Sequence, residues 1–269
     1  KLWNVVVSNG RINKTIKSEK IFLCAGSLNT TSLLIKSNLV NKKIESKFHF
    51  HPMVKFAVKF KDRVNILNGD ISPVQINENY PEFILGNASN SFSQLMINAQ
   101  GNLEMQNEIK KNYENFAMFH LTFSLGLGKV FHLPFSKDPI VSYNINEHEL
   151  NKIKSGIVKA LKFFDHNNVE KIYLIFKEKI KYDRKNFEKL IEKITEPSML
   201  NLGAVHILGG VPFGENPKNT LCNSYGELRG YSNLYVNDSS LICENLLKNP
   251  QGTVMALAKR NIQAIMKNL

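Results

Sequence analysis

The sequence predicts an α/β unit combined with an α+β domain, and three stretches carry this prediction. Residues 21–24 are a short apolar run that passes through a turn of small residues into a helix-like segment. Residues 53–61 instead alternate apolar and basic side chains, which is typical of a half-exposed antiparallel strand. From about residue 201, glycine-rich turns and short strands lead into a closing helix. Mixed strands with helices segregated from them indicate an α+β domain distinct from the opening α/β unit.

The first residues predict a β-hairpin. Trp3, Val5 and Val7 share one face of a strand, because side chains alternate along a strand with a period of two. Asn9-Gly10 follows, and this pair favours the tight turns that join antiparallel strands. The chain begins with Lys in what looks like the middle of a strand, so we expect it to be a fragment of a longer protein.

A strand, a turn and a helix are predicted next. Residues 21–24 lack polar alternation, so we expect this strand to be buried on both faces. In the helix that follows, Asn29 fits the N-cap, and Leu33 and Leu34 are the expected inward residues. The turn Ala25-Gly26-Ser27 lets backbone come close to a ligand at the carboxyl end of the strand. An ordinary tight turn is the alternative interpretation.

The middle of the chain predicts antiparallel strands and separate helices. Residues 115–132 indicate further strand around a glycine turn, and the lysine-rich run 171–194 is expected to expose its charges to solvent. Residues 146–168 predict an amphipathic helix, because apolar residues recur on one side of a 3.6-residue period. The apolar stripe of this helix comprises Leu150, Ile153, Ile157, Leu161 and Phe164.

The end of the chain predicts a strand at 233–236, the polar step Asn237-Asp238-Ser239 and a last helix. Asn249 fits the N-cap of this helix and Pro250 its first position, where the missing N–H of proline costs nothing. The backbone N–H groups of residues 251–253 should then be free at the positive end of the helix dipole, which suits negative charge. The expected inward residues of the helix are Val254, Ala258, Ile262 and Ile265, with Met255 and Met266 beside them.

Composition argues against two classes of protein. A net charge of +12 suggests polyanion binding, but the lysines are spread along the whole chain and arginine is rare, so we expect no nucleic-acid partner. No apolar run approaches the roughly 20 residues of a transmembrane helix, so we expect no transmembrane segment. Cys24, Cys222 and Cys243 form no C-x-x-C pair. They are expected to be free thiols or buried apolar residues, which favours a reducing, cytoplasmic compartment.

Several stretches, in order, resemble the glucose–methanol–choline (GMC) flavin oxidoreductases. The segments that carry the resemblance near the end are HILGG at 206–210, YGELRGYSNLYVNDSSLI at 225–242 and NPQGTVMALAKRNIQAI at 249–265. IFLCAGSLNTTSLLIKS at 21–37 resembles the internal strand–helix motif of the family, and HFHPMVKF at 49–56 resembles its segment near the flavin. Within the family, the motifs are most similar to the branch that includes cholesterol oxidases.

The resemblance implies FAD as cofactor and a small-molecule alcohol as substrate, oxidised from CH–OH to a carbonyl with hydride transfer to flavin N5. It implies an FAD-binding, Rossmann-like domain made of residues 1–46 and 201–269, interleaved with an antiparallel-sheet substrate domain at 47–200. His206 and Asn249 are the implied catalytic residues, since a histidine can take the hydroxyl proton near neutral pH. The implied FAD-binding residues are Ala25, Gly26, Ser27, Asp238, Pro250, Gln251, Gly252 and Thr253.

The sequence departs from the family in one respect. The fingerprint G-x-G-x-x-G, which holds the pyrophosphate of FAD at a helix N-terminus, is absent. We therefore expect the ADP part of FAD to be bound by a missing N-terminal segment or by a partner chain. A catalytically inactive remnant or subunit that acts as a binding module is the alternative function, and a turn-capping role is the alternative for Asp238. No cluster of His, Cys, Asp and Glu has metal-ligand spacing.

Overall fold

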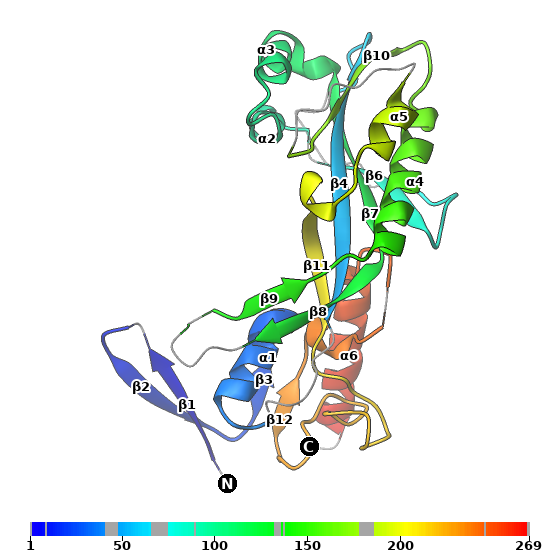
Figure 1. The fold of residues 1–269 in the computed structure, drawn as a ribbon. Helices are drawn as coiled ribbons and strands as arrows, with labels where there is room; N and C mark the ends of the chain where they lie inside the picture. Colours follow the sequence, from blue (N-terminus) through cyan, green and yellow to red (C-terminus); the bar gives the residue numbers. More distant parts are fainter. Residues whose placement is uncertain are drawn as a thin grey trace. The chain divides into compact units, whose positions relative to one another are not determined.

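The structure, a computed structural model, describes residues 2–8, 10–40, 48–65, 75–88, 90–131, 136, 138–177, 186–244 and 246–267 (Figure 1). The chain forms two compact units. Unit 1 comprises Lys1–Phe50, Leu127–Asn144 and His206–Leu269, and unit 2 comprises His51–Gly126 and Ile145–Val205. Among the described residues, no helix combines the length and the apolar character needed to cross a lipid bilayer.

Residues 127–144 lie in unit 1, whereas the sequence analysis included them in the inserted domain. The physical reason is local packing. The ring of Tyr143 lies 4.8 Å from that of Phe50, and a Cβ added at Gly128 would come within 2.0 Å of the Phe50 ring. Only glycine allows this close approach, so Phe50 joins β8 (Leu125–Phe131) and β9 (Ile140–Tyr143) to the other parts of unit 1.

The core of unit 2 is an antiparallel sheet with strand order β5-β6-β7-β4-β10. The strands are β5 (Gln75–Ile76), β6 (Phe83–Asn87), β7 (Phe116–Phe123), β4 (Phe48–Phe60), whose first three residues belong to unit 1, and β10 (Val169–Leu174). Figure 1 shows β4 as the long central strand, with α4 on one side and α2 and α3 on the other.

One face of the sheet is covered by α4 (Glu147–Phe163), with α5 (Phe187–Glu192) beside it. The side chain of Asn146 caps the first turn of α4, and Glu149 completes a capping box. Phe164 packs its ring against Phe56 of β4 at a centroid distance of 5.5 Å. The predicted stripe of Leu150, Ile153, Ile157, Leu161 and Phe164 is buried, which confirms this helix and its inward face.

The opposite face is covered by α2 (Phe92–Asn98), α3 (Leu103–Asn112) and the 3-10 turn η1 (Tyr113–Asn115). A second 3-10 turn, η2 (Pro197–Met199), comes later in the chain. A core cluster fills the space beneath α2 and α3, formed by Ala57, Leu95, Ala99, Met105, Ile109, Phe116, Met118 and Tyr173. The prediction of a half-exposed β4 is wrong at Lys59, which is 8% exposed. The cause is α3, whose Glu108 binds the Lys59 ammonium.

Unit 1 begins with the antiparallel hairpin of β1 (Trp3–Ser8) and β2 (Asn13–Ser18), which confirms the predicted hairpin. Asn9 of the predicted turn lies outside the described residues. A separate parallel pair joins β3 (Ile21–Leu23) to β12 (Leu234–Val236). The other elements are α1 (Gly26–Lys36), β11 (Gly203–Gly209), η3 (Ser239–Leu241) and α6 (Gln251–Lys267). The core of unit 1 gathers around Leu34, Leu234 and Val236.

Three expectations for β3 and α1 are wrong. Phe22 is 39% exposed, so β3 is not buried on both faces: within the described chain, β3 pairs only with β12. In α1, Leu34 is fully buried but Leu33 is 46% exposed. The N-cap of α1 is Ala25, whereas Asn29 lies inside the helix.

The closing helix also differs from the prediction. Its first hydrogen bond runs from the backbone N–H of Val254 to the Pro250 carbonyl, 2.9 Å. Pro250 therefore occupies the N-cap position expected for Asn249, and the helix begins at Gln251. Asn261 is its one buried residue among those described, and Met255 and Met266 are each 64% exposed. The expected apolar stripe at Val254, Ala258, Ile262 and Ile265 is only half-buried.

Candidate functional site

The turn after β3 and the turn after β12 are joined by the carboxylate of Asp238. Its Oδ2 accepts hydrogen bonds from the backbone N–H of Gly26 at 2.9 Å and the hydroxyl of Thr30 at 2.5 Å. Its Oδ1 accepts from the backbone N–H of Ser240 at 2.8 Å and the hydroxyl of the same residue at 2.6 Å. Each oxygen already has two donors, and Asp238 is 8% exposed. The carboxylate therefore links the two turns by hydrogen bonds and caps η3.

Ser27 extends this network towards β11. Its hydroxyl donates to the carbonyl of Ile207 at 2.8 Å and lies 3.0 Å from the hydroxyl of Ser239. Thr30 adds a second contact, because its hydroxyl oxygen accepts from the backbone N–H of Ala25 at 3.1 Å. The predicted residues Ala25, Gly26, Ser27 and Asp238 are thus held in one hydrogen-bonded group, which the structure builds from side chains at both ends of the sequence.

The turn itself leaves room for a ligand. Gly26 has φ +81°, a conformation that favours glycine, and a Cβ built on it would meet no atom within 4 Å. Ala25 and Cys24 are exposed. Since the N–H of Gly26 is already bonded to Asp238, a ligand approaching here would contact backbone and Cα atoms rather than that donor.

His206 lies on β11, one residue before the Ile207 carbonyl that accepts from Ser27. It is half-buried, and this burial lowers the pKa of the imidazole below its ordinary value of 6.5. The glycine turn that follows has a packing reason. A Cβ at Gly210 would lie 2.4 Å from the hydroxyl oxygen of Thr31 and 2.8 Å from the Phe48 ring, so the end of β11 can approach α1 only with glycine there.

The remaining predicted residues lie together at the start of α6. Asn249 is exposed and Pro250 is buried. Gln251, Gly252 and Thr253 are the first three helical residues, so their N–H groups precede the first intrahelical bond. No residue of the first turn is acidic, and a Cβ at Gly252 would meet nothing within 4 Å. This helix end therefore presents open backbone to a partial negative charge.

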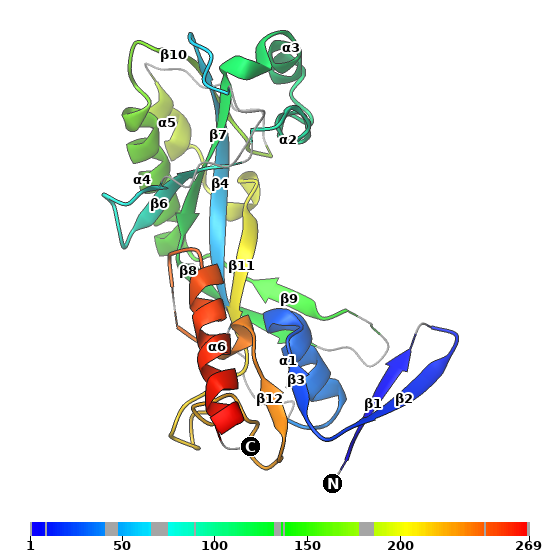
Figure 2. The same cartoon turned by 180° about the vertical axis from the view of Figure 1, so that it is seen from behind.

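The middle of α6 is anchored next to Asp238. Asn261, 1% exposed, donates from Nδ2 to Oδ1 of Asn237 at 3.2 Å. Arg260 donates to the side-chain oxygen of Asn261 at 2.8 Å and lies over the rings of Phe213 and Tyr225. Figure 2 shows α6 running alongside β12. The helix is thereby fixed relative to the strand that carries Asp238.

A cavity of about 250 Å³ lies at the amino ends of β3 and β12. Its lining includes Lys20, which precedes β3, Asn233, which precedes β12, and the side chain of Glu227. Ligands of parallel α/β sheets bind at the carboxyl ends of the strands, and this cavity lies at the amino ends. Its lining contains none of the ten predicted site residues, so the site on the Gly26–Asp238 side stays a prediction.

Sequence reasoning missed Thr30, Ser240 and Asn261. Thr30 and Ser240 supply three of the four donors to Asp238, and Asn261 anchors α6. A serine two residues after an aspartate is a local cap pattern that could have been recognised. Thr30 offered no such signal, since it lies 208 residues from Asp238 in the sequence. No group of three or more His, Cys, Asp or Glu residues in the described ranges could hold a metal ion.

Part of the chain is similar to GMC oxidoreductases. The model of that family matches residues 136–258. An uncharacterised GMC-type oxidoreductase of Sinorhizobium fredii is 24% identical over 261 residues, which cover 96% of this chain and 51% of the relative. The chain thus spans about half the length of that relative.

Solved structures with a similar fold match nearly the whole chain. Pyridoxine 4-oxidase from Mesorbium loti has a TM-score of 0.66 at 12% identity, covering 97% of this chain and 54% of its own. A variant of formate oxidase from Aspergillus oryzae has a TM-score of 0.66 at 14% identity, covering 98% and 58%. An FAD-dependent oxidoreductase from Chaetomium thermophilum reaches 0.60 at 14% identity, again covering 98% and 58%. At these identities the likeness concerns the fold.

Proposed function

We propose that this chain forms the larger part of the active site of an FAD-dependent enzyme that oxidises an alcohol to a carbonyl compound. The observation that carries the proposal is the open turn at Gly26, whose N–H is hydrogen-bonded to Asp238. This turn occurs in a chain whose residues 136–258 match the GMC oxidoreductase family. The description of the Chaetomium thermophilum neighbour as FAD-dependent supports the cofactor. The names of the other two neighbours refer to different substrates, so the assignment to the cholesterol-oxidase-like branch stays a prediction.

The turn and the helix end fit a flavin in different ways. Ala25, Gly26 and Ser27 offer backbone that a flat ring or its side chain can approach, because nothing fills the space beside Gly26. Gln251, Gly252 and Thr253 offer N–H donors at the positive end of α6. When bound, FAD supplies the acceptor for the hydride that leaves the alcohol carbon. Donors at the end of α6 stabilise negative charge there.

His206 is the proposed proton acceptor. Alcohol oxidation removes a hydride from carbon and a proton from the hydroxyl, and a general base must take that proton as the hydride leaves. Burial lowers the pKa of His206, so its imidazole is neutral at pH 7 and able to accept. Asn249 is exposed and lies two residues before the first residue of α6, and its side-chain amide is proposed to donate to the substrate oxygen or the flavin edge.

The ADP part of FAD needs residues from outside this sequence. The fingerprint G-x-G-x-x-G is absent from these 269 residues, and the chain spans about half of its relative. We propose that another segment or a partner chain supplies it, so the 269 residues alone bind FAD weakly or not at all. We propose that residues 1–46 and 201–269 form the FAD domain and that residues 47–200 form the substrate domain. The three free cysteines support our expectation of a reducing compartment.

The test uses the protein completed with its FAD-binding segment. We expect His206→Ala to lower the anaerobic rate of flavin reduction by about 100-fold or more, a typical contribution of acid–base catalysis. Asn249→Ala should cost about 1–3 kcal/mol of transition-state stabilisation through a lost hydrogen bond, with FAD still bound. Stopped-flow flavin bleaching with a panel of alcohols measures both. If both variants reduce flavin at the parental rate, these residues are structural. If the parent binds FAD but no alcohol reduces it, the chain belongs to a binding module.

A further inference from the structure

Lys55 and His120 lie side by side on one face of the sheet of unit 2. The register of β4 against β7 pairs Ala57 with Met118 and Lys55 with His120, and cross-strand partners project from the same face. Ala57 and Met118 belong to the core beneath α2 and α3. Lys55 and His120 are the next pair along that face, and both are half-buried.

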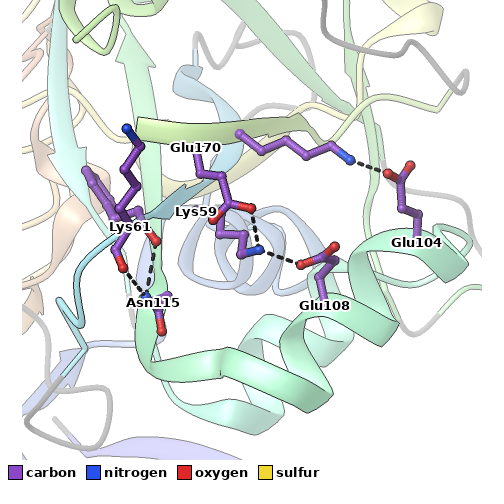
Figure 3. A network of polar contacts seen from close by, with 8 residues as sticks. Lys59, Lys61, Glu104, Glu108, Asn115 and Glu170 are labelled. Atoms are coloured by element: carbon purple, nitrogen blue, oxygen red, sulfur yellow. Dashed lines mark hydrogen bonds and ion pairs between the residues drawn. The ribbon is translucent and has the colours of Figure 1, made fainter. Parts of the chain in front are cut away.

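Lysines on this face differ in how their charge is balanced. Figure 3 shows the Lys59 ammonium between the carboxylates of Glu108 and Glu170, at 2.7 Å from each. Lys171 pairs with Glu104. Both lysines are thus neutralised, and α3 supplies Glu104 and Glu108. Lys55, four residues before Lys59 on the same strand face, has no acidic partner among the described residues.

The neighbours of Lys55 offer further hydrogen-bonding atoms and free space. The Nδ1 atom of His120 lies 2.9 Å from the hydroxyl oxygen of Thr122, which holds the ring on the sheet. A Cβ at Gly86, the partner of His120 on β6, would lie 2.9 Å from Nε2 of that ring, so only glycine leaves the ring this position. Gln75 pairs with Gly86 on β5 and places an amide in the same row. The row ends at Ile175, an apolar residue whose backbone N–H donates to the Lys55 carbonyl.

We propose that this row binds the anionic group, a carboxylate or a phosphate, of a small alcohol that is the substrate. The identification of the bound molecule as the substrate rests on the proposed function, whereas the binding of an anion does not. A half-buried lysine without an acid partner attracts an anion more strongly than a fully solvated one, because less water screens it. Lys55, Gln75 and His120 supply the polar contacts, and Ile175 and Met118 border them with apolar surface that suits the body of an organic acid.

Calorimetric binding to the full protein tests this proposal without turnover. The probes are 4-(hydroxymethyl)benzoate, its neutral methyl ester and inorganic phosphate. The variant is Lys55→Gln, and the matched control is Lys152→Gln, because Lys152 is exposed on α4, on the opposite face of the sheet. We expect saturable binding of the carboxylate or of phosphate, weakened at least about tenfold by Lys55→Gln and unchanged by Lys152→Gln. The stronger of the two anions identifies the group.

Gly86→Ala is an independent test, because it displaces the His120 ring and leaves Lys55 unchanged. It should also weaken the binding of the anion. Lys55→Arg, which keeps the charge, should restore most of the affinity and guards against loss of folding in Lys55→Gln. Binding of the neutral ester as tight as that of the stronger anion, equal effects of the Lys55 and Lys152 variants, or no saturable binding of either anion would overturn the proposal. Anion binding without any flavin reduction by alcohols would overturn the proposed function alone. Flavin reduction that is indifferent to Lys55→Gln would overturn this inference alone.

Discussion

The Asp238 carboxylate holds four donors from two elements of unit 1, α1 and η3, so its replacement has a defined cost. Asp238→Asn keeps the shape but turns one oxygen into an NH2 group, which faces donors it cannot accept from. We expect the free energy of unfolding to fall by about 2–3 kcal/mol, the range for hydrogen bonds to a charged group. Urea unfolding followed by circular dichroism measures it. The control is Asp138→Asn, at an exposed aspartate in the same unit, and it should change the free energy of unfolding little. Equal losses of stability in both variants would contradict the stabilising role of Asp238.

His206 predicts a pH dependence for flavin reduction in the completed enzyme. Burial lowers the pKa of the imidazole below 6.5, and the neutral form accepts the proton. The rate constant should therefore rise with pH, with a midpoint below 6.5, and stay level through neutral pH. The same shift makes folding less favourable as pH falls through this window, because the unfolded chain binds the proton more readily. Stopped flow across this range measures the midpoint. A midpoint above 6.5, or an unchanged profile in His206→Gln, argues against His206 as the base.

At the scale of elements, the link between α3 and the sheet depends on Lys59. Burial lowers the pKa of Lys59, but its bonds to Glu108 and Glu170 outweigh this and raise the pKa above the ordinary value. The stabilisation is therefore present at neutral pH and is lost only as the pH rises through that raised pKa. Lys59→Met leaves two carboxylates without their cation, and we expect a loss of about 1–3 kcal/mol in unfolding free energy, because both carboxylates are partly exposed.

The matched control is Lys61→Met, an exposed lysine two residues along. It should change the stability by less than about 0.5 kcal/mol, as surface substitutions usually do. Figure 3 shows that Asn115 contacts the backbone carbonyl of Lys61, a bond that this substitution keeps. If the two lysine variants lose equal stability, α3 is held by its apolar side chains alone.

Local patterns in the sequence predicted the elements that depend on local physics. The helix α4 follows from its 3.6-residue period and its capping box, both of which lie within the segment. The start of α1 does not, because the N–H of Gly26 is bonded to Asp238, and these two residues are 212 residues apart. The burial of Lys59 was likewise hidden, since a strand pattern cannot show that α3 will cover that face. The candidate site was predicted through family resemblance and stays a prediction. The role of Thr30 was missed, although this residue lies within the motif at 21–37.

At the scale of the whole molecule, three of the four boundaries between the units fall inside strands. These three lie at Phe50–His51 within β4, at Gly126–Leu127 within β8 and at Val205–His206 within β11, and the fourth, Asn144–Ile145, lies between β9 and α4. Neither unit is one continuous stretch of sequence, so no single cut releases a complete unit. Constructing either unit for separate study therefore requires joining segments.

This division has a kinetic consequence. Unit 1 must bring together three segments that are separated by the long stretches 51–126 and 145–205, and closing such loops costs chain entropy before any contact repays it. Once unit 2 has formed, those stretches are compact and the ends of the three segments are held closer together. We therefore expect amides of β4 and β7 to become protected from hydrogen exchange earlier during refolding than those of β3 and β12. Pulse-labelling with mass spectrometry measures the order, and simultaneous protection of both sets would show that the units fold in one step.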